Sequence, residues 1–185
     1  MLMIDEAHAT GVHGENGRGV CELLGVEKNV PVRIGTLSKA LGGHGGFVTG
    51  SRQLIDWLAN RARTYIFSTA APAAIAAAGL AALEIIRTEP QRRETLHARV
   101  EVLKGKLIGA GLNYAGSAQI IAIILGDPAQ TMAAAEELRR RGFFVPGIRP
   151  PSVPEGQSLL RISLTCLHTE QQIDDLVAAL CEVTR

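Results

Sequence analysis

The sequence predicts an α/β protein in which a mixed, mostly parallel sheet is followed by a small α+β module. Two apolar runs, residues 1–4 and 30–36, end at polar side chains as buried parallel strands do, and a third short run follows at 46–49. Glycine clusters separate these runs. Beyond residue 119, short β-rich runs alternate with segments of helical periodicity, which predicts the second module.

Start signals define the helices of the first part. Ser51 has the character of an N-cap for a helix over residues 51–60. Ser68 and Thr69 stand before Pro72, a residue suited to a first helical turn. We therefore expect these two hydroxyl residues to cap a helix that ends near residue 88.

The second part is predicted from the same kinds of signal. A helix over residues 90–109 is long enough to link two domains. Thr169 and Gln172 have the spacing of a capping box, which predicts the start of the last helix. Between these helices we expect strands at 119–125, 143–145 and 159–164, and a helix to residue 141 that begins at Asp127-Pro128.

The composition excludes several function classes. Lys and Arg number 19, Asp and Glu number 18, and the net charge is +1. Nothing in the chain is basic enough to neutralise a run of phosphates, so we expect no nucleic-acid partner and no membrane partner. Cys21, Cys166 and Cys181 predict free thiols in a reducing compartment, and the start of the chain lacks the pattern of a signal peptide, which predicts a cytoplasmic protein.

The segment from Thr36 to Gly45 is the most informative one. Lys39 directly follows an expected strand and stands among small residues, where we expect its amine to be poorly solvated. An amine that loses its hydration becomes a better nucleophile at neutral pH and can form an imine with an aldehyde. The alternative is a surface lysine in a glycine-rich turn.

Asp5 stands at the end of the other strongly apolar run. If the two strands are parallel neighbours, their carboxyl ends share one edge of the sheet, where ligands bind in open α/β folds. A carboxylate and a lysine at one site suit pyridoxal phosphate, which needs an amine for its imine and an acid for its pyridine nitrogen. His8 is placed to donate to the phenolic oxygen of the same ring; a packed or solvated histidine is the alternative.

Three further positions are candidate ligand contacts. Thr36 is close to Lys39 in the sequence, and Ser68 and Thr69 precede a helix, where hydroxyl and N–H groups bind phosphate. Simple capping explains these hydroxyl residues equally well. Arg161 interrupts an apolar strand, so it is either an edge-strand surface residue or a bidentate partner of a substrate carboxylate.

Two motifs carry a resemblance to a known family. The run from Thr36 to Gly45 resembles, at every constrained position, the lysine-attachment signature of class-II pyridoxal-phosphate aminotransferases, T-[hydrophobic]-[small]-K-[small]-[hydrophobic]-[small]-x-x-[small]. Asp5-Glu6-Ala7-His8-x-x-Gly11, continued by Gly14-Glu15-x-Gly17-Arg18-Gly19, is similar to the α-oxoamine synthases in particular. The resemblance implies a fold-type-I enzyme in which residues 1–95 are the C-terminal part of the cofactor-binding large domain and residues 96–185 are the C-terminal small domain.

The resemblance also implies a role for each candidate residue. Lys39 and His8 would be catalytic, with Lys39 bound covalently to pyridoxal 5'-phosphate and His8 at its phenolic oxygen. Asp5 would pair with the pyridine nitrogen and Thr36 would bind the phosphate. Active sites in this family lie at the interface of a homodimer, so Ser68 and Thr69 would reach the cofactor phosphate of the neighbouring subunit. Arg161 would hold the carboxylate of the amino acid.

The loop at Ile148-Arg149-Pro150-Pro151 indicates which reaction the resemblance implies. It is most similar to family members that condense L-alanine with a pimeloyl thioester, such as pimeloyl-CoA, and release carbon dioxide in biotin synthesis. A glycine C-acetyltransferase-like activity is one alternative. Family chains are longer on the N-terminal side, and the abrupt apolar start at Met1 indicates that this half is missing. A fragment without catalysis of its own, dependent on the missing half, is therefore the second alternative.

Other interpretations of the first motif are weaker. Residues 4–8 also spell the metal-binding box of DEAH-type helicases, but the sequence has no G-x-x-x-x-G-K-[ST] phosphate loop. Asp5, His8 and His13 lack a recognisable metal-ligand spacing, so we expect no metal site. The glycines at 42–46 lack the G-x-G-x-x-G spacing of a dinucleotide-binding turn.

Overall fold

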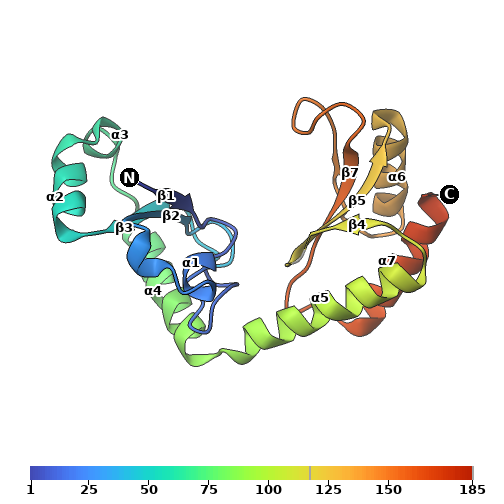
Figure 1. The fold of residues 1–185 in the computed structure, drawn as a ribbon, viewed down its shortest axis with the longest axis horizontal. Coiled ribbons are helices and arrows are strands. Elements are labelled where there is room, and N and C mark those ends of the chain that lie inside the picture. Colours follow the sequence, from blue (N-terminus) through green and yellow to red (C-terminus); the bar gives the residue numbers. More distant parts are fainter. Residues whose placement is uncertain (117, 185) are drawn as a thin grey trace. The chain divides into compact units, whose positions relative to one another are not determined.

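The computed structural model describes residues 1–116 and 118–184. The chain divides into two compact units, Met1–Arg93 and Glu94–Arg185, and Figure 1 labels most of their elements. Helix α5 (Gln91–Gly109) begins in the first unit and continues into the second. The assignment of the two parts of the chain as a partial large domain and a small domain stays a prediction.

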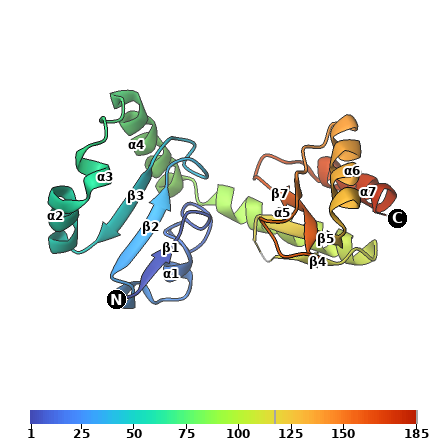
Figure 2. The same cartoon turned by 90° about the horizontal axis from the view of Figure 1, so that it is seen from above.

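A three-stranded sheet forms the centre of the first unit. Strands β1 (Met3–Asp5), β2 (Val32–Thr36) and β3 (Gly46–Gly50) lie side by side in this order (Figure 2). β1 runs parallel to β2, whereas β3 runs antiparallel to β2. All three predicted strands are confirmed, and the sheet is mixed.

A glycine in β2 makes room for an aromatic ring on β3. Gly35 pairs with Phe47 across the two strands and is buried. A Cβ atom built on Gly35 would lie 2.2 Å from the ring of Phe47. The ring therefore covers β2 at the one strand position that has no side chain.

The longer helices of the first unit begin close to the predicted positions. α2 (Arg52–Arg61) is capped by the side chain of Ser51, which accepts from the N–H of Leu54 at 3.2 Å, as predicted. α4 (Ala73–Thr88) is correct in extent, but its predicted cap is wrong. The N-cap is Pro72, with no side-chain cap bond, and the Ser68 hydroxyl donates to the carbonyl of Thr64 instead. Ser68 and Thr69 stand too far upstream to reach the first free N–H groups of α4.

Three short helical turns complete the first unit, and the sequence patterns did not predict them. They are too short to show a helical period. They are α1 (Val20–Leu23), a 3₁₀ turn (Glu27–Asn29) and α3 (Arg63–Ile66).

The second unit contains a four-stranded antiparallel sheet with the order β4-β5-β7-β6. Its long strands, β5 (Ile120–Gly126) and β7 (Ser158–Ser163), confirm two predicted strands. The predicted strand at 143–145 is wrong, because the neighbour of β7 is β6 (Gly147–Ile148), and β4 (Tyr114–Ala115) was not predicted. The β propensity of residues 143–145 is overridden by their position in the loop after a helix.

Helices α6 (Pro128–Arg140) and α7 (Glu170–Val183) lie on one side of this sheet (Figure 1). Both begin at predicted caps: Asp127 accepts from the N–H of Gln130 at 2.6 Å, and Thr169 forms the capping box. Within the described residues no helix combines the length and the apolar stretch that crossing a bilayer requires. The core of this unit consists of side chains that are at most 3% exposed, including Leu103, Leu107, Ile121, Ile123, Leu138, Leu160, Ile162, Ile173 and Leu180.

We expect Gly35→Ala to destabilise the first unit by about 1–3 kcal/mol, the usual cost of inserting a methyl group into a filled site. Urea unfolding followed by far-UV circular dichroism measures the loss. Gly46→Ala on the adjacent strand is the matched control, because its Cβ would approach nothing closer than the carbonyl oxygen of Gly35 at 3.4 Å. Equal losses from the two substitutions would contradict the packing role of Gly35.

Candidate active site

The carboxyl ends of β1 and β2 lie at one edge of the sheet and carry three of the predicted site residues. Asp5 is the last residue of β1 and pairs with Ile34, and the N–H of Glu6 donates to the carbonyl of Ile34 at 2.7 Å. Thr36 is the last residue of β2, and Lys39 follows in the next loop. The structure therefore brings the end of β1 beside the end of β2, as the two apolar runs predicted.

Backbone hydrogen bonds close the loop that carries Lys39. The N–H of Leu37 donates to the carbonyl of Gly45 at 2.9 Å, and the N–H of Gly42 donates to the carbonyl of Lys39 at 2.9 Å. The side chain of Lys39 is exposed, so the expectation of poor solvation is wrong. Its small neighbours do not crowd the amine, because they have few side-chain atoms with which to cover it. The covalent role of Lys39 stays a prediction.

The hydroxyl of Thr36 ties the two ends of this loop together. Its Oγ1 donates to the carbonyl of Gly45 at 2.9 Å and accepts from the N–H of Ser38 at 3.1 Å. It also shares a 2.7 Å hydrogen bond with the hydroxyl of Ser38. Ser38 is a polar group at the site that sequence reasoning missed, although it stands within the lysine-attachment signature. The phosphate-binding role of Thr36 stays a prediction.

A turn after β1 carries Asp5 and His8. Oδ1 of Asp5 accepts from the N–H of Ala7 at 2.8 Å, and the side chains of Asp5 and His8 are both exposed. The carbonyl of Glu6 accepts from the N–H groups of Ala9 and of the next residue, each at 2.8 Å. The turn is therefore held by its backbone, while the two candidate side chains stay exposed on it.

Glu6 is the second residue of the site that sequence reasoning missed. Its side chain is only 3% exposed, and its two carboxylate oxygens accept from the N–H groups of Val20 and Cys21, each at 2.8 Å. Burial raises the pKa of the Glu6 carboxyl, but hydrogen bonds from Cys21 and Val20 outweigh burial and hold that pKa below its ordinary 4.5. The sequence signal for Glu6 was its place between the two candidate residues, within the motif that resembles the α-oxoamine synthases.

The glycine-rich loop over residues 11–19 is held from two sides. The buried Arg93 donates from Nη2 to the carbonyl of Glu15 at 2.6 Å and from Nη1 to the carbonyl of Ile86 at 2.7 Å. The carboxylate of Glu22 accepts from the N–H groups of Asn16 and Arg18. Burial raises the pKa of the Glu22 carboxyl, but a hydrogen bond from the Asn16 side-chain amide, together with these backbone bonds, outweighs burial and holds that pKa below its ordinary value.

Ser68 and Thr69 lie in the link between α3 and α4, and both are exposed. Their predicted contact with the phosphate of a neighbouring subunit's cofactor stays a prediction. Within residues 1–116 and 118–184, no group of three or more His, Cys, Asp and Glu side chains is arranged to hold a metal ion.

Arg161 belongs to the second unit and lies on an interior strand. β7 pairs with β5 on one side and with β6 on the other, so the interpretation of Arg161 as an edge-strand residue is wrong. Its neighbours Leu160 and Ile162 are buried, whereas Arg161 alternates with them and is half-buried. Among the described residues its guanidinium has no hydrogen-bond or ion-pair partner.

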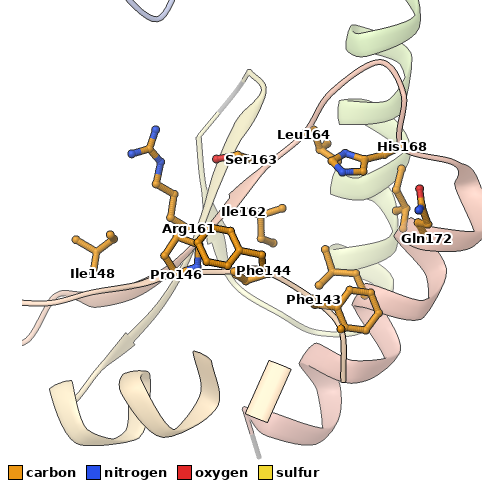
Figure 3. Close-up of a pocket in the computed structure, with 14 residues that line it drawn as sticks. Phe143, Phe144, Pro146, Ile148, Arg161, Ile162, Ser163, Leu164, His168 and Gln172 are labelled. Atoms are coloured by element: carbon orange, nitrogen blue, oxygen red, sulfur yellow. The ribbon is translucent and has the colours of Figure 1, made fainter. Parts of the chain in front are cut away.

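A pocket of about 640 Å³ lies beside Arg161 in the second unit. Figure 3 shows the aromatic side chains of Phe143 and Phe144 along it, and the side chain of Arg161 extending away from Phe143 and His168. The lining is mostly apolar, and Arg161 is the only lysine or arginine among the described residues that form it. A planar guanidinium without a partner is suited to a carboxylate.

We expect Cys21 to react with iodoacetamide far more slowly than Cys166 or Cys181 in the folded protein at about pH 8, because the thiolate is the reactive form. Burial raises the pKa of the Cys21 thiol to about 11, and Glu6 adds to that shift, whereas Cys166 and Cys181 are partly exposed. Mass spectrometry of labelled peptides measures the rates. In urea all three cysteines should react alike, and rapid labelling of Cys21 in the native protein would contradict the packing at Glu6.

Comparisons with known proteins identify what the chain is similar to. The family described as aminotransferase class I and II matches residues 1–180. A protein of Anaeromyxobacter dehalogenans (strain 2CP-C) named 8-amino-7-oxononanoate synthase is 49% identical over 184 residues, which are 99% of this chain and 46% of that protein. A protein of the same name from Saccharophagus degradans is 44% identical over 100% of this chain and 47% of its own. The chain spans about half the length of these curated relatives.

Solved structures show the same relationship. Serine palmitoyltransferase from Sphingomonas wittichii has a TM-score of 0.93 and 32% identity, over 99% of this chain and 47% of its own. A structure of SPT with PLP has a TM-score of 0.94 over 99% of this chain and 47% of its own, at 32% identity. The 8-amino-7-oxononanoate synthase of Francisella tularensis has a TM-score of 0.88 at 28% identity, over 98% of this chain and 54% of its own.

These matches confirm the predicted resemblance, the fold-type-I architecture and the cofactor of the family, pyridoxal phosphate. The enzyme class is confirmed at the level of the family, because the matching family is one of aminotransferases, the curated relatives are named as synthases, and a structural neighbour is SPT with PLP. The chain belongs to the aminotransferase class I and II family.

Proposed function

We propose that the chain supplies the cofactor lysine and the substrate-binding arginine of an 8-amino-7-oxononanoate synthase. The enzyme joins L-alanine to a pimeloyl thioester, such as pimeloyl-CoA, with loss of carbon dioxide, in biotin biosynthesis. One observation carries the proposal: the lysine-attachment signature follows β2 directly beside Asp5 of β1, in a chain that is 49% identical to a protein of that name.

The residues at the strand ends have the chemical groups that pyridoxal phosphate requires. An exposed amine, an exposed carboxylate and a hydroxyl lie on Lys39, Asp5 and Thr36, around one edge of the sheet. When bound, this cofactor is an electron sink that stabilises negative charge at the α-carbon of an amino acid. The amine, the carboxylate and the hydroxyl are the groups that its aldehyde, pyridine nitrogen and phosphate require.

Each side chain then has a distinct task. The Lys39 amine would hold the cofactor and would accept the α-proton of the substrate when it is free. The Asp5 carboxylate would keep a proton on the pyridine nitrogen, and His8 would donate to the phenolic oxygen. Thr36 would bind the phosphate, and Ser68 and Thr69 would bind that of a neighbouring subunit's cofactor.

Arg161 provides the remaining contact of the amino acid. Its guanidinium, which has no partner among the described residues, binds the carboxylate of L-alanine through two parallel hydrogen bonds. A fixed carboxylate limits the orientations of the α-carbon, which is how binding energy contributes to rate.

We further propose that the enzyme is a cytoplasmic homodimer and that this chain depends on the remaining half of the family fold. Large apolar side chains stay exposed in the first unit, which supports coverage by other polypeptide. Examples are Trp57, Tyr65, Phe67, Leu80 and Leu83. The three cysteines are free thiols, as a reducing compartment requires.

We expect Lys39→Ala to abolish the borohydride-stable adduct that the wild-type chain forms with pyridoxal phosphate, because the reduced bond joins the cofactor to this amine. Absorbance and peptide mass mapping after reduction measure the adduct. Lys28→Ala removes another exposed lysine of the same unit and should leave the adduct on Lys39 unchanged. A labelled Lys39→Ala variant, or equal labelling at Lys28 in the wild type, would contradict the assignment.

Turnover assays then separate the candidate activities. L-alanine with pimeloyl-CoA should release coenzyme A and carbon dioxide, whereas glycine with acetyl-CoA tests the acetyltransferase alternative. Adduct formation without either turnover favours a fragment that needs the remaining half. A wild-type chain that forms no adduct contradicts independent cofactor binding.

We expect Arg161→Ala to raise the L-alanine concentration at half-saturation at least about tenfold, because hydrogen bonds to charged groups contribute about 1.5–3 kcal/mol. The change in cofactor absorbance during an L-alanine titration measures it. Arg161→Lys keeps the charge but loses the planar guanidinium, so its half-saturating L-alanine concentration should lie between those of the wild type and Arg161→Ala. Arg139→Ala, an exposed arginine of α6, is the control, and an unchanged titration for Arg161→Ala would refute the carboxylate contact.

A further inference from the structure

Glu6 forms hydrogen bonds to three segments of the candidate active site. Its N–H donates to the carbonyl of Ile34 on β2 at 2.7 Å. Its carbonyl oxygen accepts from the N–H groups of Ala9 and Thr10, each at 2.8 Å, and from the Thr10 hydroxyl at 3.0 Å. The backbone of Glu6 therefore fixes β2 and the turn that carries His8 at the same time.

The side chain of Glu6 fixes a third segment. Its carboxylate accepts from the N–H groups of Val20 and Cys21 at the start of α1. It also packs on Gly19, where φ is +116° and an added Cβ would lie 2.5 Å from a carboxylate oxygen. A charge that is 3% exposed and packed on bare backbone has no room to adopt a second arrangement.

The neutral amide of glutamine has nearly the same shape but the wrong hydrogen-bonding groups. The glutamine side chain has one oxygen, which accepts, and one NH₂ group, which only donates. Its NH₂ group would therefore face the backbone N–H of Val20 or of Cys21, and two donors cannot form a hydrogen bond. That buried N–H group would lose its partner, and the turn would move to restore one. Because Asp5 precedes Glu6 and His8 follows it closely, such a movement would carry both side chains with it.

We propose that Glu6 is a positioning residue of this enzyme: its buried carboxylate sets the direction in which Asp5 and His8 meet the cofactor. The part of this proposal that concerns the cofactor rests on the proposed function. The part that concerns the position of the turn rests only on the hydrogen bonds of Glu6. Glu6 itself touches neither cofactor nor substrate in this assignment.

The first test is amide hydrogen exchange by NMR on the full chain. In Glu6→Gln, the amides of Val20 and Cys21 should exchange at least about tenfold faster, the equivalent of one lost hydrogen bond to a charged group. The imidazole resonances of His8 should shift, whereas those of His168, which belongs to the second unit, should not. Glu22→Gln is the matched control, because its carboxylate also accepts N–H groups of the glycine-rich loop but not those of Val20 or Cys21.

The second test is cofactor affinity. The dissociation constant for pyridoxal phosphate, measured by absorbance, should rise about tenfold in Glu6→Gln and stay within about twofold in Glu22→Gln. A purely structural role would lower the stability of both variants without this difference in affinity. Glu6→Asp keeps the charge on a shorter side chain, so its dissociation constant should lie between those of Glu6→Gln and Glu22→Gln. If Glu6→Gln does not fold, Glu6→Asp is compared with Glu22→Gln in its place.

A folded Glu6→Gln variant with unchanged His8 resonances and unchanged cofactor affinity overturns the proposal, and so do equal effects from Glu22→Gln. If the wild-type chain binds no pyridoxal phosphate, independent cofactor binding is refuted, and the exchange rates and His8 resonances alone decide whether Glu6 positions the turn.

Discussion

Asp5 lies opposite Ile34 in the parallel pair of β1 and β2, and this register decides where the candidate residues of the first unit lie. A shift of one residue would turn the Asp5 side chain to the other face of the sheet. The adjacent Glu6 secures the register, because its N–H binds the carbonyl of Ile34. Its buried carboxylate is stable only while the N–H groups at the start of α1 face it. The register of β1 and β2 and the position of the glycine-rich loop therefore depend on each other.

The parts of the structure that could be predicted from the sequence are those encoded over a few residues. The caps at Ser51 and Asp127 and the capping box at Thr169 join groups that are three positions apart, so their spacing is visible in the chain itself. The common edge of Asp5 and Lys39 could also be predicted, because parallel strands always end at the same side of a sheet.

The parts that could not be predicted depend on contacts between distant residues. The interior place of Arg161 follows from the pairing of β6 with β7, which no local pattern encodes. The exposure of Lys39 depends on which other segments cover its loop. Ser68 is a residue type typical of a helix cap, but the helix begins only after Pro72, which is its N-cap. Glu6 reaches Val20 across a loop whose path only the folded backbone defines.

The contact between Gly35 and Phe47 has a consequence for how such a sequence can change over time. A side chain at position 35 is acceptable only where a smaller group has already replaced the ring at position 47, since the two would otherwise occupy the same space. The reverse order, loss of the ring first, leaves a cavity that a later side chain at position 35 can fill. The two positions therefore form one coupled unit with a preferred order of substitution.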